Sequence, residues 1–368
     1  MNYSGGLGIG VIQEDSQGAR ERTKKIWDKA LREGSSTYTT GKGDHGNGER
    51  VLVIGGTGYI GQALIPELSA RGYQPVVLSR QTGFQEKFPN AEVIAGSVCD
   101  RADLKRAFAN GQIEGVITLL ACRNIIDEAL CWQVDYVANN SIIEEAREQG
   151  VKHLIHTSDY GAYRPKLPTQ FYKLRIEGEL LGQHHAPLNF TIIRPTSYFP
   201  HLSLNFETAR SGKPVPIFEH GEWGIFNPIA REDLAEFFVN TLFEENRFGK
   251  ILPVGGPWVP ENMCTAKSSS DMMFEILGME SRYKTISMKS WDRLIRMAKY
   301  IGVLIPMVRR GMLYMQAIKY WSTTSHFAPA YGTRTLKDFY RKLAQREYKP
   351  KGFFERMRGG TAAMPTDI

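Results

Sequence analysis

The chain has 368 residues, is 42% hydrophobic and carries a formal net charge of +7. This length suits one large α/β domain with an appendage, or two domains. No apolar run reaches the roughly 20 residues with which a helix spans a bilayer. The four cysteines lie far apart without a CxxC pair, so we expect neither a metal site nor a disulfide framework.

Residues 1–49 are predicted to form an arm outside the fold, because Gly-rich polar pieces occupy 5–10 and 41–48. Acidic residues are spread through this arm, whereas transit peptides are rich in Arg and Ser and poor in acids. A targeting signal is therefore either unreadable in this sequence or already removed.

The most informative stretch runs from Val51 to Gly61, where four apolar residues lead into a glycine-rich turn and then into a helical pattern. Gly55, Gly58 and Gly61 have the spacing of a dinucleotide-binding turn. The first permits the tight turn, the second lets the backbone approach the pyrophosphate, and the third lets the helix pack closely. The expected cofactor contacts in this stretch are Gly55, Thr57, Gly58, Tyr59, Ile60 and Gly61.

Strand and helix patterns then alternate up to residue 195, which predicts a doubly wound parallel sheet of the Rossmann type. The strands are expected near 51–54, 75–79, 91–95, 115–120, 153–157 and 189–193. After residue 195 the rhythm loosens. We place the NADP-binding Rossmann core at 51–195, a smaller interleaved substrate-side region at 196–345, and a basic tail at 346–368.

Arg80 follows the second strand, where the adenosine ribose of a cofactor would lie. An acid at this place would favour NAD, whereas an arginine accommodates the additional phosphate of NADP. We therefore expect NADPH as the cofactor. Ser97 and Ala121, at the ends of the third and fourth strands, are further expected contacts, although ordinary loop roles stay open for each.

Ser158 follows the fifth strand, and Lys173 lies one helix later. In dehydrogenases with this arrangement the lysine holds the nicotinamide ribose and a neighbouring hydroxyl donates a proton. The usual tyrosine four residues before the lysine is replaced by Thr169. Tyr160 and Tyr172 are nearby hydroxyls, each of which could instead be a packing residue. We expect Lys173, Ser158 and Tyr160 at the catalytic position.

The positive charge is concentrated near the C-terminus, since residues 289–358 hold sixteen Lys or Arg against four Asp or Glu. From 293 to 305 basic and apolar residues alternate at near-helical spacing, as in a helix that lies on an anionic membrane or against a partner. A core helix with a solvated basic side has the same pattern. We expect peripheral contact of 289–358 with a membrane or membrane complex, and no nucleic acid, because no recognition motif is present.

Several further segments resemble the atypical short-chain dehydrogenase/reductases, and within them the divinyl chlorophyllide 8-vinyl reductases. They are 120–124, 132–135, 173–180, 193–199, 212–214, 227–234, 252–257, 276–278 and 330–339. The resemblance implies an oxidoreductase of chlorophyll synthesis that uses NADPH to reduce a vinyl group of a tetrapyrrole-like substrate. It also implies a chloroplast protein that is peripheral to a membrane.

The chain departs from this family at two places, in the run 158–165 and in a short insertion that is missing after 319–326. Both places are expected near the substrate. They support an alternative, in which the chain is a non-catalytic NADPH-binding subunit or assembly factor of a photosynthetic or respiratory membrane complex. A mitochondrial location belongs to that alternative.

Overall fold

The structure is a computed structural model that describes Tyr38 and residues 45–346, except 81, 82, 123, 126, 183–187, 303 and 304. Almost all of the expected arm at 1–49, and all but the first residue of the expected tail at 346–368, lie outside the described residues.

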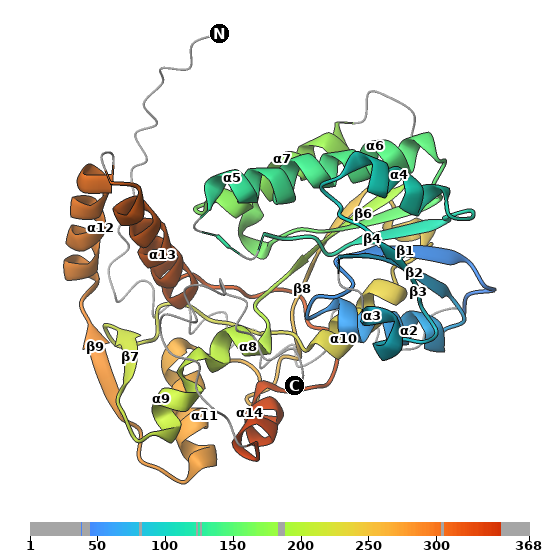
Figure 1. The fold of residues 1–368 in the computed structure, drawn as a ribbon. Coiled ribbons are helices and arrows are strands. Elements are labelled where there is room, and N and C mark those ends of the chain that lie inside the picture. The colour runs from blue at the N-terminus through green and yellow to red at the C-terminus, as the bar shows by residue number, and fades with distance from the viewer. Residues whose placement is uncertain are drawn as a thin grey trace.

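Seven parallel strands form the main sheet, in the order β3-β2-β1-β4-β5-β6-β8 (Figure 1). The strands are β1 Arg50–Ile54, β2 Gln74–Ser79, β3 Glu92–Ala95, β4 Gly115–Thr118, β5 His153–Thr157, β6 Phe190–Pro195 and β8 Lys250–Val254. Val53 in β1 lies opposite Val77 in β2 and Ile117 in β4. The expected fold class is confirmed. The strand order reverses between β1 and β4, and open α/β sheets bind ligands at such a point.

Helices cover both faces of this sheet, which is why its strands are mostly apolar. Val51 and Val53 point into one core with α2 (Gly61–Ala70) and α10 (Arg231–Val239), whereas Leu52 and Ile54 point into another with α4 (Arg101–Ala109), α6 (Asn139–Glu148) and α7 (Pro168–Leu181). The helices of this layer are α2 Gly61–Ala70, α3 Phe84–Lys87, α4 Arg101–Ala109, α5 Glu128–Cys131, the π-helix Trp132–Ala138, α6 Asn139–Glu148, the 3-10 helix Tyr160–Tyr163, α7 Pro168–Leu181, α10 Arg231–Val239 and the 3-10 helix Glu245–Arg247.

The sheet layer does not end at residue 195. Its edge strand β8 and the helix α10 both come from the stretch expected to lie on the substrate side, and α10 packs on α2. The chain thus returns to the sheet after building part of a second region, so the two regions are interleaved and the boundary drawn at 195 does not separate them.

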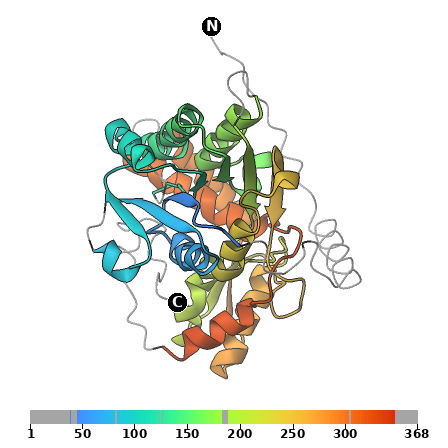
Figure 2. The same cartoon turned by 90° about the vertical axis from the view of Figure 1, so that its right-hand side faces the viewer.

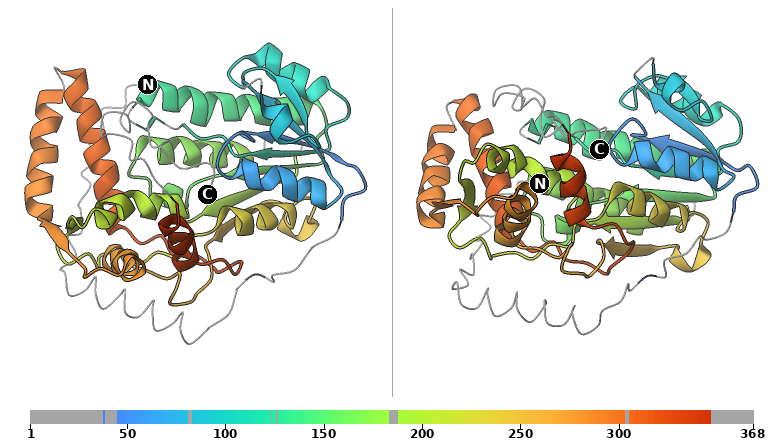
Figure 3. Two further views of the ribbon diagram at one scale, coloured as in Figure 1. Left: turned by 60° about the horizontal axis from the view of Figure 1, so that its bottom comes forward. Right: turned by 90° about the horizontal axis from the view of Figure 1, so that it is seen from below.

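The second region has its own core and a two-stranded parallel sheet of β7 and β9. Its elements are α8 Phe199–Leu202, the 3-10 helix Ser203–Asn205, α9 Phe206–Arg210, β7 Val215–Phe218, α11 Ala266–Leu277, β9 Tyr283–Ile286, α12 Met288–Gly302, α13 Pro306–Thr323 and α14 Leu336–Ala344. Helices α12 and α13 form a hairpin at the end of the molecule away from β1–β3, whereas α14 lies along the lower side (Figures 1, 2 and 3). Among the described residues, no helix combines the length and apolarity needed to cross a bilayer.

Candidate functional site

The glycine turn lies between the end of β1 and the start of α2. Gly55 has a φ of +82°, a left-handed conformation that suits glycine, and the N–H of Gly58 donates to the Gly55 carbonyl over 2.9 Å. Helix α2 begins at Gly61 with neither a side-chain cap nor an acid in its first turn. In the described part of the chain, the N–H groups of Tyr59 and Ile60 have no acceptor. The positive end of α2 is therefore available to an anion such as a pyrophosphate.

The remaining expected cofactor contacts lie along the same carboxyl edge of the sheet. Arg80 follows β2, Ser97 follows β3, and Ala121 follows β4. The Arg80 side chain is exposed, and no carboxylate among the described residues pairs with it. The N–H of Ser97 donates to Asp103 over 2.8 Å, which fixes that loop. The structure thus brings the glycine turn and these three positions to one edge.

Lys173 lies on α7, beside the carboxyl ends of β4 and β5. It is 5% exposed, and its Nζ donates to the carbonyls of Leu120, over 2.7 Å, and Thr157, over 2.8 Å. Burial lowers the pKa of Lys173, against the raising effect of nearby carboxylates. Two of the three ammonium N–H bonds have acceptors among the described residues, so the third can serve a ribose hydroxyl.

Asp135 is a buried acid beside Lys173 that the sequence reasoning missed. It lies on the π-helix, and one of its oxygens accepts the N–H of Cys122 over 2.8 Å. Its other oxygen has no partner among the described residues. Burial raises the pKa of Asp135, although the Lys173 ammonium opposes this. The carboxylate holds the backbone just after Ala121, and π-helical segments are frequent at such functional places.

Ser158 belongs to a buried network with Glu177 and Arg194. Its Oγ donates to Glu177 Oε1 over 2.5 Å, and Arg194 donates to both oxygens of Glu177, with Nε 2.8 Å from Oε1. The hydroxyl proton of Ser158 is thus held by Glu177. Neither Glu177 nor Arg194 was expected here, although Glu177 lies four residues after Lys173 on the same face of α7.

Tyr160 turns its hydroxyl toward the second region. The hydroxyl donates to the carbonyl of Phe327 over 2.6 Å. Burial, with a smaller effect of Tyr163, raises the pKa of Tyr160 to about 12. The structure therefore places Lys173 and Ser158 at the end of β5, while the Tyr160 hydroxyl proton is engaged elsewhere.

Aromatic rings from the segments that follow β5 and β6, and from the end of α13 and just beyond it, lie close together, and we call them the aromatic cluster. It consists of Tyr160, Tyr163, Tyr198, His201, Tyr320, Trp321 and His326. The rings of His201 and Trp321 are stacked, with an interplanar angle of 11°. Burial lowers the pKa of His201 to about 4, so this ring is neutral at pH 7. The Tyr198 ring centroid lies 6.1 Å from that of Tyr59, which joins the cluster to the glycine turn.

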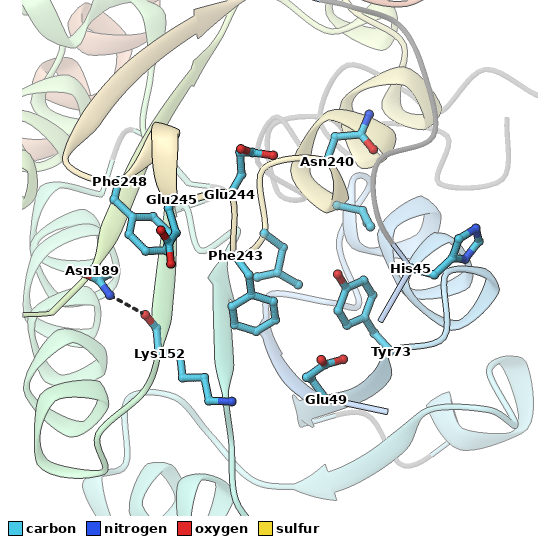
Figure 4. A pocket seen from close by; sticks show the side chains of 12 residues that line it. His45, Glu49, Tyr73, Lys152, Asn189, Asn240, Phe243, Glu244, Glu245 and Phe248 are labelled. Atoms are coloured by element: carbon cyan, nitrogen blue, oxygen red, sulfur yellow. Dashed lines mark hydrogen bonds between the residues drawn. The ribbon is translucent and has the colours of Figure 1, made fainter. Parts of the chain in front are cut away.

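A cavity of about 400 Å³ lies at the opposite edge of the sheet (Figure 4). Its lining includes Tyr73, just before β2, and Lys152, just before β5, whose carbonyl accepts from Asn189 over 3.2 Å. None of the expected site residues lines it. Parallel sheets bind their ligands at the carboxyl ends of the strands, so this cavity at the amino ends is not the candidate site.

Gly61→Ala tests the close packing that the glycine turn requires. A Cβ at residue 61 would lie 2.3 Å from the Gly56 carbonyl oxygen, so the turn must open. We expect at least about a tenfold loss of nicotinamide-cofactor affinity, by titration, and a lower Tm. Gly178→Ala, in α7 with open space around it, is the matched control and should raise the Tm. Equal affinity in the two variants would contradict the assignment of the turn.

The comparisons with known proteins agree with this geometry. Residues 55–245 match a family model described as NAD(P)H-binding. The chain is 30% identical over 321 residues to the chloroplastic divinyl chlorophyllide a 8-vinyl-reductase of Oryza sativa subsp. indica, spanning 80% of this chain and 78% of the relative. It is 28% identical over 323 residues to the enzyme of the same name from Arabidopsis thaliana, spanning 80% and 76%.

Two weaker similarities extend this result. The Photosystem II assembly factor Ycf39 of Synechocystis is 27% identical over 217 residues, which span 56% of this chain and 62% of that protein. The structure of the Thermus thermophilus UDP-glucose 4-epimerase in complex with NAD matches with a TM-score of 0.55 at 24% identity, covering 65% of this chain and 86% of that one, and supports the fold. The chain therefore belongs to the atypical short-chain dehydrogenase/reductases, a family of NAD(P)-dependent oxidoreductases that includes the divinyl chlorophyllide a 8-vinyl-reductases.

Proposed function

We propose that this protein is an NADPH-dependent reductase that acts on a vinyl group of a flat, apolar, tetrapyrrole-like substrate. One observation carries the proposal: the buried ammonium of Lys173 lies at the ends of β4 and β5, on the edge that holds both the glycine turn and the aromatic cluster. A cofactor on the turn and a planar substrate on the cluster would thus meet beside Lys173.

The residues present fit a nicotinamide dinucleotide. Gly55 and Gly61 lack the side chains that would fill the turn, and the amides at the start of α2 suit a pyrophosphate. Arg80 would bind the 2′-phosphate of NADPH, and the third N–H bond of Lys173 would bind the nicotinamide ribose. The bound cofactor supplies the hydride, and the protein orients it.

The proton that completes the reduction is assigned to solvent. The hydroxyl protons of Ser158 and Tyr160 are held by Glu177 and by the Phe327 carbonyl, which makes both poor donors in this arrangement. Ser158 Oγ keeps acceptor capacity and would orient the cofactor or substrate. Lys173 remains the residue that touches the cofactor in this proposal.

A second candidate function is a non-catalytic NADPH-binding subunit or assembly factor of a membrane complex. Thr169 stands where the usual tyrosine would supply a proton, both candidate hydroxyls are engaged, and one relative is named as a photosystem assembly factor. In that case NADPH would be a structural ligand. Because the relatives from Oryza sativa and Arabidopsis thaliana are named chloroplastic, we propose the plastid as the location of a reductase or of a photosynthetic subunit, and the mitochondrion only for a subunit of a respiratory complex.

Turnover of divinyl chlorophyllide with NADPH, followed by chromatography of the product, separates the two functions. The wild-type protein should form the reduced product. Lys173→Met should lower kcat at least about a hundredfold, because the nicotinamide ring is then no longer held in the orientation that hydride transfer to the substrate requires. Lys166→Met, at an exposed position before α7, is the control and should keep full activity. Tight NADPH binding without any turnover would instead support the subunit function.

Arg80→Asp tests the preference for NADPH. Replacing the guanidinium by a carboxylate removes an attraction to the 2′-phosphate and adds repulsion, whereas a 2′-hydroxyl can donate to the new carboxylate. We expect affinity for NADPH to fall about 10²-fold and affinity for NADH to change little. Arg282→Asp, an equal charge change at an exposed position beside β9, controls for net charge. Equal losses for both cofactors would contradict the phosphate assignment.

A further inference from the structure

Helix α12 shows one side to α13 and the other to solvent. Its buried residues are Ala298 and Gly302. Trp291 Nε1 donates to the Met315 carbonyl of α13 over 3.1 Å, and Asp292 pairs with Lys319 of α13 over 2.6 Å. These contacts fix which face of α12 lies against its neighbour and which remains outside.

The outer face of α12 has an apolar stripe. Leu294, Met297 and Ile301 are spaced by three and four residues, so they lie on one side of the helix. Each is 45–58% exposed. Ile305 and Met307, at the start of α13, are also exposed. Among the described residues, α13 is the one element with extensive contacts to α12, and none of the three stripe residues belongs to a hydrophobic cluster.

Basic side chains border the stripe on its free side. Arg293 and Arg296 are exposed. Helical spacing places them on the side of the stripe that is away from α13. Between 288 and 323 the chain has seven Lys or Arg and a single acid, Asp292, which Lys319 already neutralises. The hairpin thus carries a net charge of +6.

We propose that the outer face of α12 docks on an anionic lipid surface. An interfacial helix buries an apolar stripe at the boundary between head groups and acyl chains, with Lys and Arg beside it at the level of the phosphates. The stripe, its basic border and the absence of an unpaired acid from 288–323 match that arrangement. Tyr300, 79% exposed on the same border, has the amphipathic ring that favours this boundary.

The position of the hairpin relates docking to the proposed active site. Tyr320 and Trp321, near the C-terminal end of α13, belong to the aromatic cluster. A docked hairpin therefore holds the substrate side near the lipid, within reach of an apolar substrate dissolved there. This consequence rests on the proposed function, whereas the docking itself does not.

Flotation of the full chain with lipid vesicles tests the docking. Wild-type protein should float with vesicles of phosphatidylcholine and phosphatidylglycerol, and less with phosphatidylcholine alone. Met297→Glu/Ile301→Glu should lower partitioning onto the anionic vesicles at least about tenfold, because two charges then enter the apolar boundary. Leu181→Glu/Leu204→Glu adds the same charge at other exposed leucines and should bind measurably better than the stripe variant.

Arg293→Gln/Arg296→Gln should weaken binding to the anionic vesicles and leave the weak binding to phosphatidylcholine unchanged. Failure of the wild type to float, or equal binding by the stripe variant and its control, would overturn the proposal. Binding of an acidic protein by the stripe in place of lipid would overturn it as well. NADPH affinity and turnover, measured on the same samples, keep this result separate: a protein that floats but does not turn over contradicts only the reductase function.

Discussion

The anchoring of the Lys173 ammonium is the interaction on which the rest of the site depends. Its two hydrogen bonds tie α7 to the ends of β4 and β5. One side chain therefore fixes the distance between this helix and the edge of the sheet where the strand order reverses, between β1 and β4. Removing an amine from water is costly unless its protons are bonded and charges of opposite sign are near. Asp135, Asp159 and Glu177 provide that compensation. A buried, compensated ammonium is therefore held at the place where cofactor and substrate would meet.

The same compensation limits the chemistry of the neighbouring hydroxyls. Glu177 is shared between Arg194 and Ser158, so the serine is part of the network that balances the buried charges and is a poor proton donor. Tyr160 is bonded to the second region. The site is thus well built for binding and orientation, and in the proposed reaction the proton would come from solvent. Those properties suit reduction of a carbon–carbon double bond, in which hydride transfer is the demanding step.

Much of the sheet could be predicted from the sequence because six of its strands are short segments with a mostly apolar centre. The seventh, β8, was missed because Pro253 makes its segment look like a loop. An edge strand tolerates proline, since one side of its backbone needs no partner, and β8 is such a strand.

The glycine turn was predictable because its three glycines lie within seven consecutive residues. The contacts of Asp135 and of Glu177 with Arg194 were not, because they join segments that only the fold brings together. The pattern from 293 to 305 was compatible with both a core and a surface helix until the contacts of α12 with α13 were known.

The measurement that tests the account most directly is isotope transfer from the cofactor to the product. NADPH labelled with deuterium at the transferred position of the nicotinamide should deliver one deuterium to the reduced side chain of the substrate, detected by mass spectrometry. In heavy water with unlabelled NADPH, the product should gain one deuterium from solvent. Product without label from the cofactor, or no product from a protein that binds NADPH, would contradict a reductase in which Lys173 orients the cofactor for hydride transfer.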